Sequence, residues 1–289
     1  MPFAPGGGSD LFVRTIGAKL TESTGQAVVI DNRPGANGIV AGSIASKTPA
    51  DGYTVLLDTN NMVLNDVLRK NLPFDALKDF VPVVRPAWVT HVIAVNPKSS
   101  KSIGNLDQLI AVMKAQPGRI SYGSFGSGST AHMAGELFDS MAGTKGLHVP
   151  YKGGAPAIVA LLGNEVDVVY GTLPLVLPYL KSGQLRAVAV TSLQRVAALP
   201  DVPTVAERLP NYNVDLWWAF FVPSNTSKAI VTLLNREILA ALSSAESRQK
   251  LSPLGYNLTS STPEQVIEAL RVEKNKWENL VKSTNIKLD

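Results

Sequence analysis

The stretch ISYGSFGSGSTAHMAGELFDSMA, residues 120–142, has a short apolar run, a glycine-rich segment and an amphipathic segment in succession. Its first part, Ile120–Gly123, is predicted to be a buried strand, and Ala131–Ala142 is predicted to be an amphipathic helix. The loop between them is rich in glycine and serine, and glycine lets the backbone approach a ligand closely. A strand, a loop and a helix in this order form the repeating unit of an α/β fold.

Similar units continue in both directions along the chain, which predicts an α/β protein with a parallel or mixed sheet. The predicted strands, rich in Val and Ile, are Ala27–Ile30, Thr54–Asp58, His91–Val95, Ile120–Gly123, Leu147–Pro150, Val166–Tyr170, Leu185–Thr191 and Trp217–Val222. The predicted helices are Leu11–Thr24, Ile39–Lys47, Asn105–Ala115, Ala131–Ala142, Pro156–Gly163, Pro174–Ser182, Lys228–Ser243 and Pro263–Ser283.

Composition excludes several classes of protein. The chain has 289 residues, of which 45% are hydrophobic and 17% charged, so a large folded core is expected and disorder is not. A net charge of +4 is too small to indicate nucleic-acid binding. Cysteine is absent, which excludes thiol catalysis and cysteine–zinc sites, and three histidines are too few for a multi-histidine metal centre.

Two crossing points predict two lobes. Asn96-Pro97 ends a strand, and a second crossing fits near Asp215–Ala219. The predicted first lobe contains residues 1–97 plus 218–289, and the second contains residues 98–217. We expect the two crossings to form a hinge and the cleft between the lobes to hold the ligand.

Two more glycine-rich loops precede helices: residues 5–10, PGGGSD, and residues 151–155, YKGGA. Unpaired amides and the positive end of a helix favour an anion, which predicts a small-anion site if the three loops converge. The alternative for each loop is a tight turn with a helix cap, for which Ser9 or Asp10 would serve in the first loop.

Catalytic motifs are missing. The flanks of Ser127 are Phe125 and Ser129, so the Gly-x-Ser-x-Gly elbow of serine hydrolases is absent. The relaxed dinucleotide pattern beginning at Gly126 has no acidic residue after the next strand, and no phosphate-binding P-loop is present. His132 and Glu136 could ligate a metal, but a capped or packed first helical turn fits them better. We therefore predict no catalytic residue, no metal and no cofactor.

An ordered series of motifs resembles one family of receptors. The series comprises PFAPGG with Asp10, NRPGA at 32–36 with Gly38, PADGYT at 49–54, KDF at 78–80, YGS at 122–124 with Gly126 and Gly128, HVPYKG at 148–153, LPDVPTV at 199–205 with Glu207, Trp218 and Pro223. The chain resembles the Bug-type, TctC-like periplasmic solute receptors of tripartite tricarboxylate transporters.

The resemblance implies a Venus-flytrap periplasmic-binding-protein fold and a small organic acid as ligand: a di- or tricarboxylate, an acidic amino acid or an aromatic acid. It implies carboxylate binding by two loops and by neighbouring strand ends, with Asp10 capping its helix or orienting a water. The implied ligand-binding residues are Phe3, Gly6, Gly7, Ser9, Asp10, Thr59, Asn60, Ser127, Gly128, Ser129, Thr130, Gly153, Gly154, Gly171 and Thr172.

The resemblance also implies a periplasmic, mostly monomeric protein that delivers its ligand to membrane subunits of a transporter. Family members have a strand and a signal peptide before the first loop, and both are expected to be missing from this sequence as it stands. Two alternative functions are a ligand-dependent sensory module acting on a sensor kinase, and a hydrolase using Ser127 or Ser129 with His132.

Overall fold

The computed structural model describes residues 1–99, 101 and 103–284, and the chain divides into two compact units. The first unit contains Met1–Trp88 and the chain from Trp217 onward, and the second contains Val89–Leu216. The chain therefore leaves the first unit within strand β2 (Phe80–Val95) and returns to it within strand β7 (Asp215–Pro223). The boundaries read from the sequence, at 97/98 and 217/218, stay a prediction.

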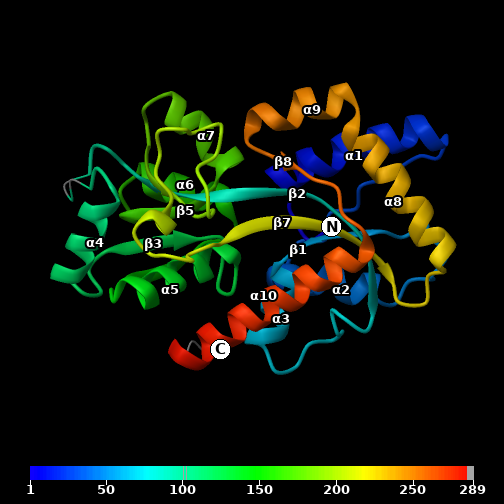
Figure 1. The fold of residues 1–289 in the computed structure, drawn as a ribbon, viewed down its shortest axis with the longest axis horizontal. Helices are drawn as coiled ribbons and strands as arrows, with labels where there is room; N and C mark the ends of the chain where they lie inside the picture. Colours follow the sequence, from blue (N-terminus) through cyan, green and yellow to red (C-terminus); the bar gives the residue numbers. More distant parts are fainter. Residues whose placement is uncertain (100, 102, 285–289) are drawn as a thin grey trace. The chain divides into compact units, whose positions relative to one another are not determined.

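In the first unit the hydrophobic core packs around a small sheet. Strand β7 lies between β1 and the first part of β2, antiparallel to β1, and β8 pairs with β2. Around a core that includes Met62, Phe74, Trp217 and Phe221, helices α8 and α9 lie beside α1, and α10 lies beside α3 (Figure 1). The elements are α1 (Gly8–Thr24), α2 (Ile39–Ala45), β1 (Leu56–Thr59), α3 (Asn61–Leu68), α8 (Lys228–Ser243), α9 (Ala245–Leu251), β8 (Asn257–Leu258) and α10 (Pro263–Thr284).

The second unit is an α/β layer with a parallel centre. Strands β3, β4 and β5 are parallel, and the second part of β2 is antiparallel to both β5 and β6. Because β3, β4 and β5 point the same way, their carboxyl ends share one edge, and the helices that follow begin there. The elements are α4 (Leu106–Ala115), β3 (Ser121–Ser124), α5 (Thr130–Ala142), β4 (Leu147–Pro150), α6 (Gly154–Leu162), β5 (Val168–Thr172), α7 (Leu173–Lys181) and β6 (Arg186–Val190).

The predicted α/β class with a mixed sheet is confirmed, but one predicted strand is wrong. Residues 27–30 have no regular secondary structure, and Val29 is 84% exposed. The amide of Val28 donates to the hydroxyl of Thr21 instead of to a strand. An apolar run forms a strand only where a partner strand lies alongside, and among the described residues none does.

Three other elements were missed or only partly predicted from the sequence. Strand β2 begins eleven residues before His91, at Phe80, and this early part contains Pro82 and Pro86, which argue against a strand because proline cannot donate to the ladder. Pro86 still accepts a hydrogen bond at its carbonyl from the Thr259 amide. Helices α3 and α9 were also missed, since each has only seven or eight residues.

Candidate functional site

The first glycine-rich loop opens directly into helix α1. Its N-cap is Gly7, with φ −83° and ψ 174°, and no side chain caps the helix. The first helical hydrogen bond runs from the Leu11 amide to the Gly7 carbonyl, 3.0 Å. In the part of the chain that the structure describes, the amides of Gly7, Gly8 and Ser9 have no hydrogen-bond acceptor. The prediction that Ser9 or Asp10 caps this helix is therefore wrong, and a row of amides remains open.

Asp10 is fully engaged inside the first unit. Its carboxylate accepts from Arg14 Nε at 2.8 Å, from Asn32 Nδ2 at 3.0 Å and from the Gly6 amide at 3.1 Å. The hydrogen bond from Arg14 is the main reason that the pKa of Asp10 is lowered to about 2. The carboxylate therefore fixes the loop while its charge is balanced by the guanidinium, and the Gly6 amide is not open to a ligand.

Three aromatic rings, those of Phe12, Trp218 and Tyr256, pack together next to the start of α1. Phe12 stacks on Trp218 with centroids 5.4 Å apart and on Tyr256 at 5.9 Å. Trp218 Nε1 donates to the Ser9 hydroxyl and the Tyr256 hydroxyl donates to the Gly8 carbonyl, both at 2.8 Å. All three rings thus pack in the core, and Trp218 and Tyr256 each hold one residue at the start of α1 by a hydrogen bond. Phe3, another predicted site residue, is partly exposed, and its carbonyl accepts from Asn32 at 2.9 Å.

The predicted site residues at the end of β1 are buried. Thr59 and Asn60 have no exposed surface, and Asn60 exchanges hydrogen bonds with the backbone of Trp217 on β7. The Thr59 hydroxyl accepts from the Asn61 amide at 3.3 Å. Asp58 is also buried, and burial raises its pKa to about 7. These groups form part of the framework of the first unit.

In the second unit, the loop after β3 folds into a turn with its own hydrogen bonds. The Ser129 amide donates to the Gly126 carbonyl at 3.1 Å, and the Ser129 hydroxyl caps α5 by accepting from the His132 amide at 3.3 Å. The Gly128 amide donates to His132 Nδ1 at 3.1 Å. Ser127 is exposed at the tip. Most polar groups of this loop therefore fix its shape, and Ser127 is the one that faces solvent.

The same hydrogen bonds bear on the hydrolase alternative. The Ser129 hydroxyl donates to the Gly126 carbonyl at 2.7 Å, and His132 Nδ1 is taken by a backbone amide, so these two side chains form no nucleophile–base pair. Ser124 does bond to His148 Nε2 at 2.6 Å, but Ser124 has no exposed surface. In the described chain, no serine–histidine pair is open to a substrate.

Helix α6 begins without a side-chain cap. Its N-cap, Gly153, has φ +114°, a conformation that only glycine adopts readily. The amides of Gly153, Gly154 and Ala155 have no acceptor in the described chain, and all three residues are partly or fully exposed. The start of α6 thus offers three open amides. The sequence predicted more ligand-binding residues in the loop before α5 than in this one.

The other predicted residues at this edge have separate roles. Gly171 is buried, and a Cβ atom there would lie 2.4 Å from Val176, so this glycine permits close packing. Thr172, opposite His91 in the β2–β5 register, is partly exposed, and its hydroxyl has no partner among the described residues. The Thr130 hydroxyl lies 3.0 Å from His91 Nε2.

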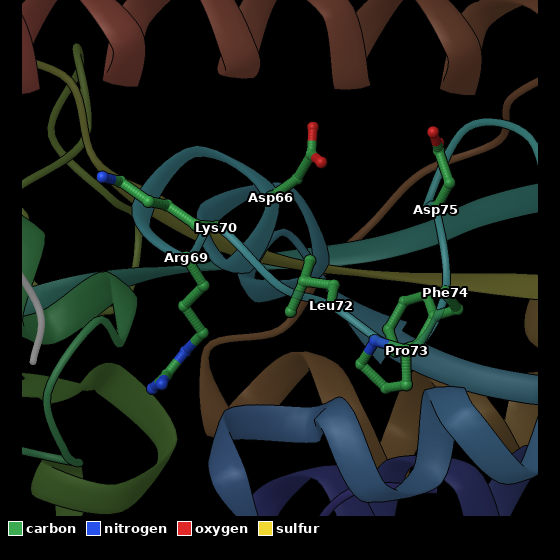
Figure 2. A pocket seen from close by; sticks show the side chains of 7 residues that line it. All are labelled: Asp66, Arg69, Lys70, Leu72, Pro73, Phe74 and Asp75. Carbon is green, nitrogen blue, oxygen red and sulfur yellow. The ribbon is translucent and has the colours of Figure 1, made fainter.

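Elsewhere, the first unit has a surface pocket of about 350 Å³ at the end of α3 (Figure 2). Its two carboxylates are paired, Asp66 with Lys274 and Asp75 with Lys78. In Figure 2 the side chains of Arg69 and Lys70 extend away from Asp75 rather than toward it. The described residues contain no cluster of three metal-ligating side chains, and no helix among them is both long and apolar enough to span a membrane.

Comparison with known proteins assigns the family. Residues 12–286 match the profile of the TctC family, the tripartite tricarboxylate transporter family receptor. BugT of Bordetella pertussis is 37% identical over all of this chain and 89% of its own length. A Rhodopseudomonas palustris protein solved with adipate superposes with a TM-score of 0.92 at 34% identity, over 99% of this chain and 96% of that one.

Two further solved structures have the same fold. The periplasmic binding protein BugD gives a TM-score of 0.90 at 28% identity, over 99% of this chain and 96% of that one. MatC from Rhodopseudomonas palustris, solved with bound malate, gives 0.88 at 26% identity, over 97% of this chain and 96% of that one. With a matching family profile over nearly its whole length and full-length relatives, the chain belongs to the TctC family of tripartite tricarboxylate transporter receptors.

Proposed function

We propose that the protein is a periplasmic receptor that captures a small dicarboxylate and delivers it to the membrane subunits of a tripartite tricarboxylate transporter. The observation that carries the proposal is the uncapped start of α1, where the amides of Gly7, Gly8 and Ser9 are open. The negative charge of the neighbouring Asp10 carboxylate is balanced by its ion pair with Arg14.

The second unit supports the same chemistry. The open amides of Gly153, Gly154 and Ala155 lie at the start of α6, where the helix dipole favours an anion. The Ser127 and Thr172 hydroxyls add neutral donors. Each unit therefore offers neutral hydrogen-bond donors that suit a carboxylate.

The ligand class is supported by related structures. One is solved with adipate and another with malate, and both ligands are dicarboxylates. Hydrogen bonds from neutral donors to a carboxylate contribute about 1.5–3 kcal/mol each before desolvation. A few such bonds account for recognition without a buried arginine.

Isothermal titration calorimetry with a matched ligand panel tests the proposal. We expect adipate or malate to bind, adipamide (the uncharged diamide of adipate) to give no heat, and a monocarboxylate of the same chain length to bind at least tenfold more weakly. Equal binding of the diamide, or no heat with any member of a panel of di- and tricarboxylates, would refute the proposed ligand class. Detergent-solubilised transporter subunits retained by the ligand-loaded receptor, and not by a denatured control, would support the delivery step.

A further inference from the structure

All three histidines of the chain bond to the loop 124–130 of the second unit. His91 Nε2 lies 3.0 Å from the Thr130 hydroxyl, His148 Nε2 lies 2.6 Å from the Ser124 hydroxyl, and His132 Nδ1 accepts from the Gly128 amide at 3.1 Å. Since this loop contains the exposed Ser127, the histidines fasten a segment that we assign to ligand binding. No other imidazole exists in the chain, so a histidine titration reports on this loop.

The bond between His132 and Gly128 requires a neutral imidazole. A backbone amide can only donate, so His132 Nδ1 must carry a lone pair. The ring proton then lies on Nε2, which is 3.4 Å from Glu136 Oε1. Tyr122 also donates to that carboxylate oxygen, at 2.6 Å, and fixes its position. Glu136 thus selects the tautomer that leaves Nδ1 free to accept.

His148 adds a second reason for neutrality. Its ring stacks on the ring of His132 with centroids 3.8 Å apart and planes inclined by 18°. Burial, and then the neighbouring His132, lower the pKa of His148 to about 3. His148 therefore remains neutral at ordinary pH, and a charge on His132 would lie face to face with a poorly solvated ring.

Other titratable groups around His132 lie on α5 itself and on the elements packed against it. On α5 itself are Glu136 and Asp139, and burial raises the pKa of Asp139. The groups facing α5 from neighbouring elements are His91 on β2, Tyr122 on β3, His148 on β4, Tyr170 on β5, and Tyr212, whose hydroxyl donates to the Ala134 carbonyl. Burial raises the pKa of the three tyrosines. Of the two carboxylates on α5, Glu136 is the one that contacts the His132 ring, at Nε2, where it favours a cation. The Gly128 amide opposes protonation at Nδ1, because two hydrogen-bond donors would then face each other.

We propose that neutral His132 is a positioning residue that holds the loop 124–130 in its binding conformation, and that its protonation weakens carboxylate binding. The affinity rests on the proposed function, whereas the positioning of the loop does not. Protonation of Nδ1 would remove the lone pair that accepts from the Gly128 amide, so affinity should fall when His132 gains a proton.

Nuclear magnetic resonance of the full chain without ligand tests the positioning directly. The neutral ring of His132 should carry its proton on Nε2, and the Gly128 amide resonance should shift with the same midpoint as His132. His132→Asn places an amide oxygen where Nδ1 lies, so it should keep the Gly128 hydrogen bond but remove its pH dependence. A neutral ring with its proton on Nδ1, or a Gly128 amide that ignores the His132 titration, would overturn the proposal.

Calorimetry with adipate and malate, at pH 8 and at a pH below the midpoint measured from the His132 resonances, tests the consequence for binding. We expect the unchanged chain to bind roughly three- to tenfold more weakly at the lower pH, the fold-change of one lost hydrogen bond. His132→Asn should lack this component, and the comparison cancels protonation of the ligand itself. His148→Gln, which keeps a partner for Ser124, should retain it.

The two proposals can fail separately. An equal pH effect in His132→Asn, or its loss in His148→Gln alone, would overturn the role of His132. If the chain binds neither acid at any pH, the proposed ligand class fails, while the resonances of His132 and Gly128 still decide whether His132 positions the loop.

Discussion

Two loops of similar sequence are fastened by opposite kinds of interaction. The loop before α1 is held by a charge pair, Asp10 with Arg14, whereas the loop before α5 is held by uncharged histidines. The pKa of Asp10 is lowered to about 2, so its pair persists across the physiological range, whereas protonation of His132 Nδ1 would remove the acceptor of the Gly128 amide. Glycine and serine content thus predicts a loop, but the side chains that fasten it decide how it responds to pH.

The largest expected effect comes from removing the carboxylate that fixes the loop before α1. Asp10→Ala removes the acceptor of three hydrogen bonds, from Arg14, Asn32 and Gly6. At about 1 kcal/mol per bond, with Arg14 half exposed, we expect unfolding to become easier by about 2–3 kcal/mol and dicarboxylate affinity to fall more than tenfold. Urea denaturation and calorimetry measure the two effects.

An exposed acid in the same unit provides the control for Asp10. Asp31 pairs with Arg33 at the surface, where both side chains are more than half exposed. Asp31→Ala should change the free energy of unfolding by less than about 0.5 kcal/mol. Similar losses in both variants would show that Asp10 is not a special anchor.

Two buried groups, His91 in the second unit and Asp58 in the first, should respond to pH in opposite directions. Burial lowers the pKa of His91 to about 4, below its unfolded value near 6.5, so its contribution to stability is present above pH 6.5 and is lost as pH falls toward 4. Burial raises the pKa of Asp58 to about 7, above its unfolded value near 3.8, so its contribution is present below pH 3.8 and is lost as pH rises toward 7.

Unfolding free energies between pH 4 and 8 test this contrast. His91→Gln should flatten the loss on the acid side, and Asp58→Asn should remove the loss toward neutrality. Each variant serves as the control for the other, because the groups lie in different units. A pH profile that neither substitution changes would contradict the assignment of both buried groups.

A smaller effect is expected for the aromatic support of the first loop. Trp218→Phe keeps a ring against Phe12 but removes the hydrogen bond to Ser9, which should cost about 1 kcal/mol of stability and several-fold in affinity. Tyr212→Phe removes a buried hydrogen bond to the Ala134 carbonyl in the second unit and should cost similar stability with little change in affinity. If both variants lose affinity equally, general destabilisation explains the result.

The smallest expected effect is at the tip of the second loop. Ser127→Ala removes an exposed hydroxyl and should leave stability within about 0.5 kcal/mol while weakening ligand binding two- to fivefold. Ser129→Ala, two residues away, removes the α5 cap and should cost about 1 kcal/mol of stability. Thermal unfolding separates them, and a larger loss of stability for Ser127→Ala would reverse our assignment of the two serines.

Local patterns predicted the parts of the structure that depend on local sequence. The strand–loop–helix unit at 120–142 was predicted correctly because its periodicity and glycines lie within one short segment. The bonds of Asp10 with Arg14 and of His132 with Gly128 also join residues four apart, a spacing that the sequence displays although it does not reveal their function.

The features that escaped prediction depend on distant partners. Residues 27–30 have the composition of a strand but no neighbouring strand in the described chain, whereas β2 forms through Pro82 and Pro86 because its neighbours pair with it. The contacts of His91 with Thr130 and of His148 with Ser124 span more than twenty residues. Such contacts arise from sheet order, which local periodicity does not contain.

The most direct test of the account is a matched pair of variants at Gly7, measured by calorimetry with adipate and malate. The φ of −83° at Gly7 suits either alanine, which keeps the amide, or proline, which removes it, and a Cβ atom there would lie no closer than 3.9 Å to its neighbours. We predict that Gly7→Ala binds within twofold of the unchanged chain and that Gly7→Pro binds at least about tenfold more weakly. Equal affinity of the two variants would contradict carboxylate capture by the open amides of α1.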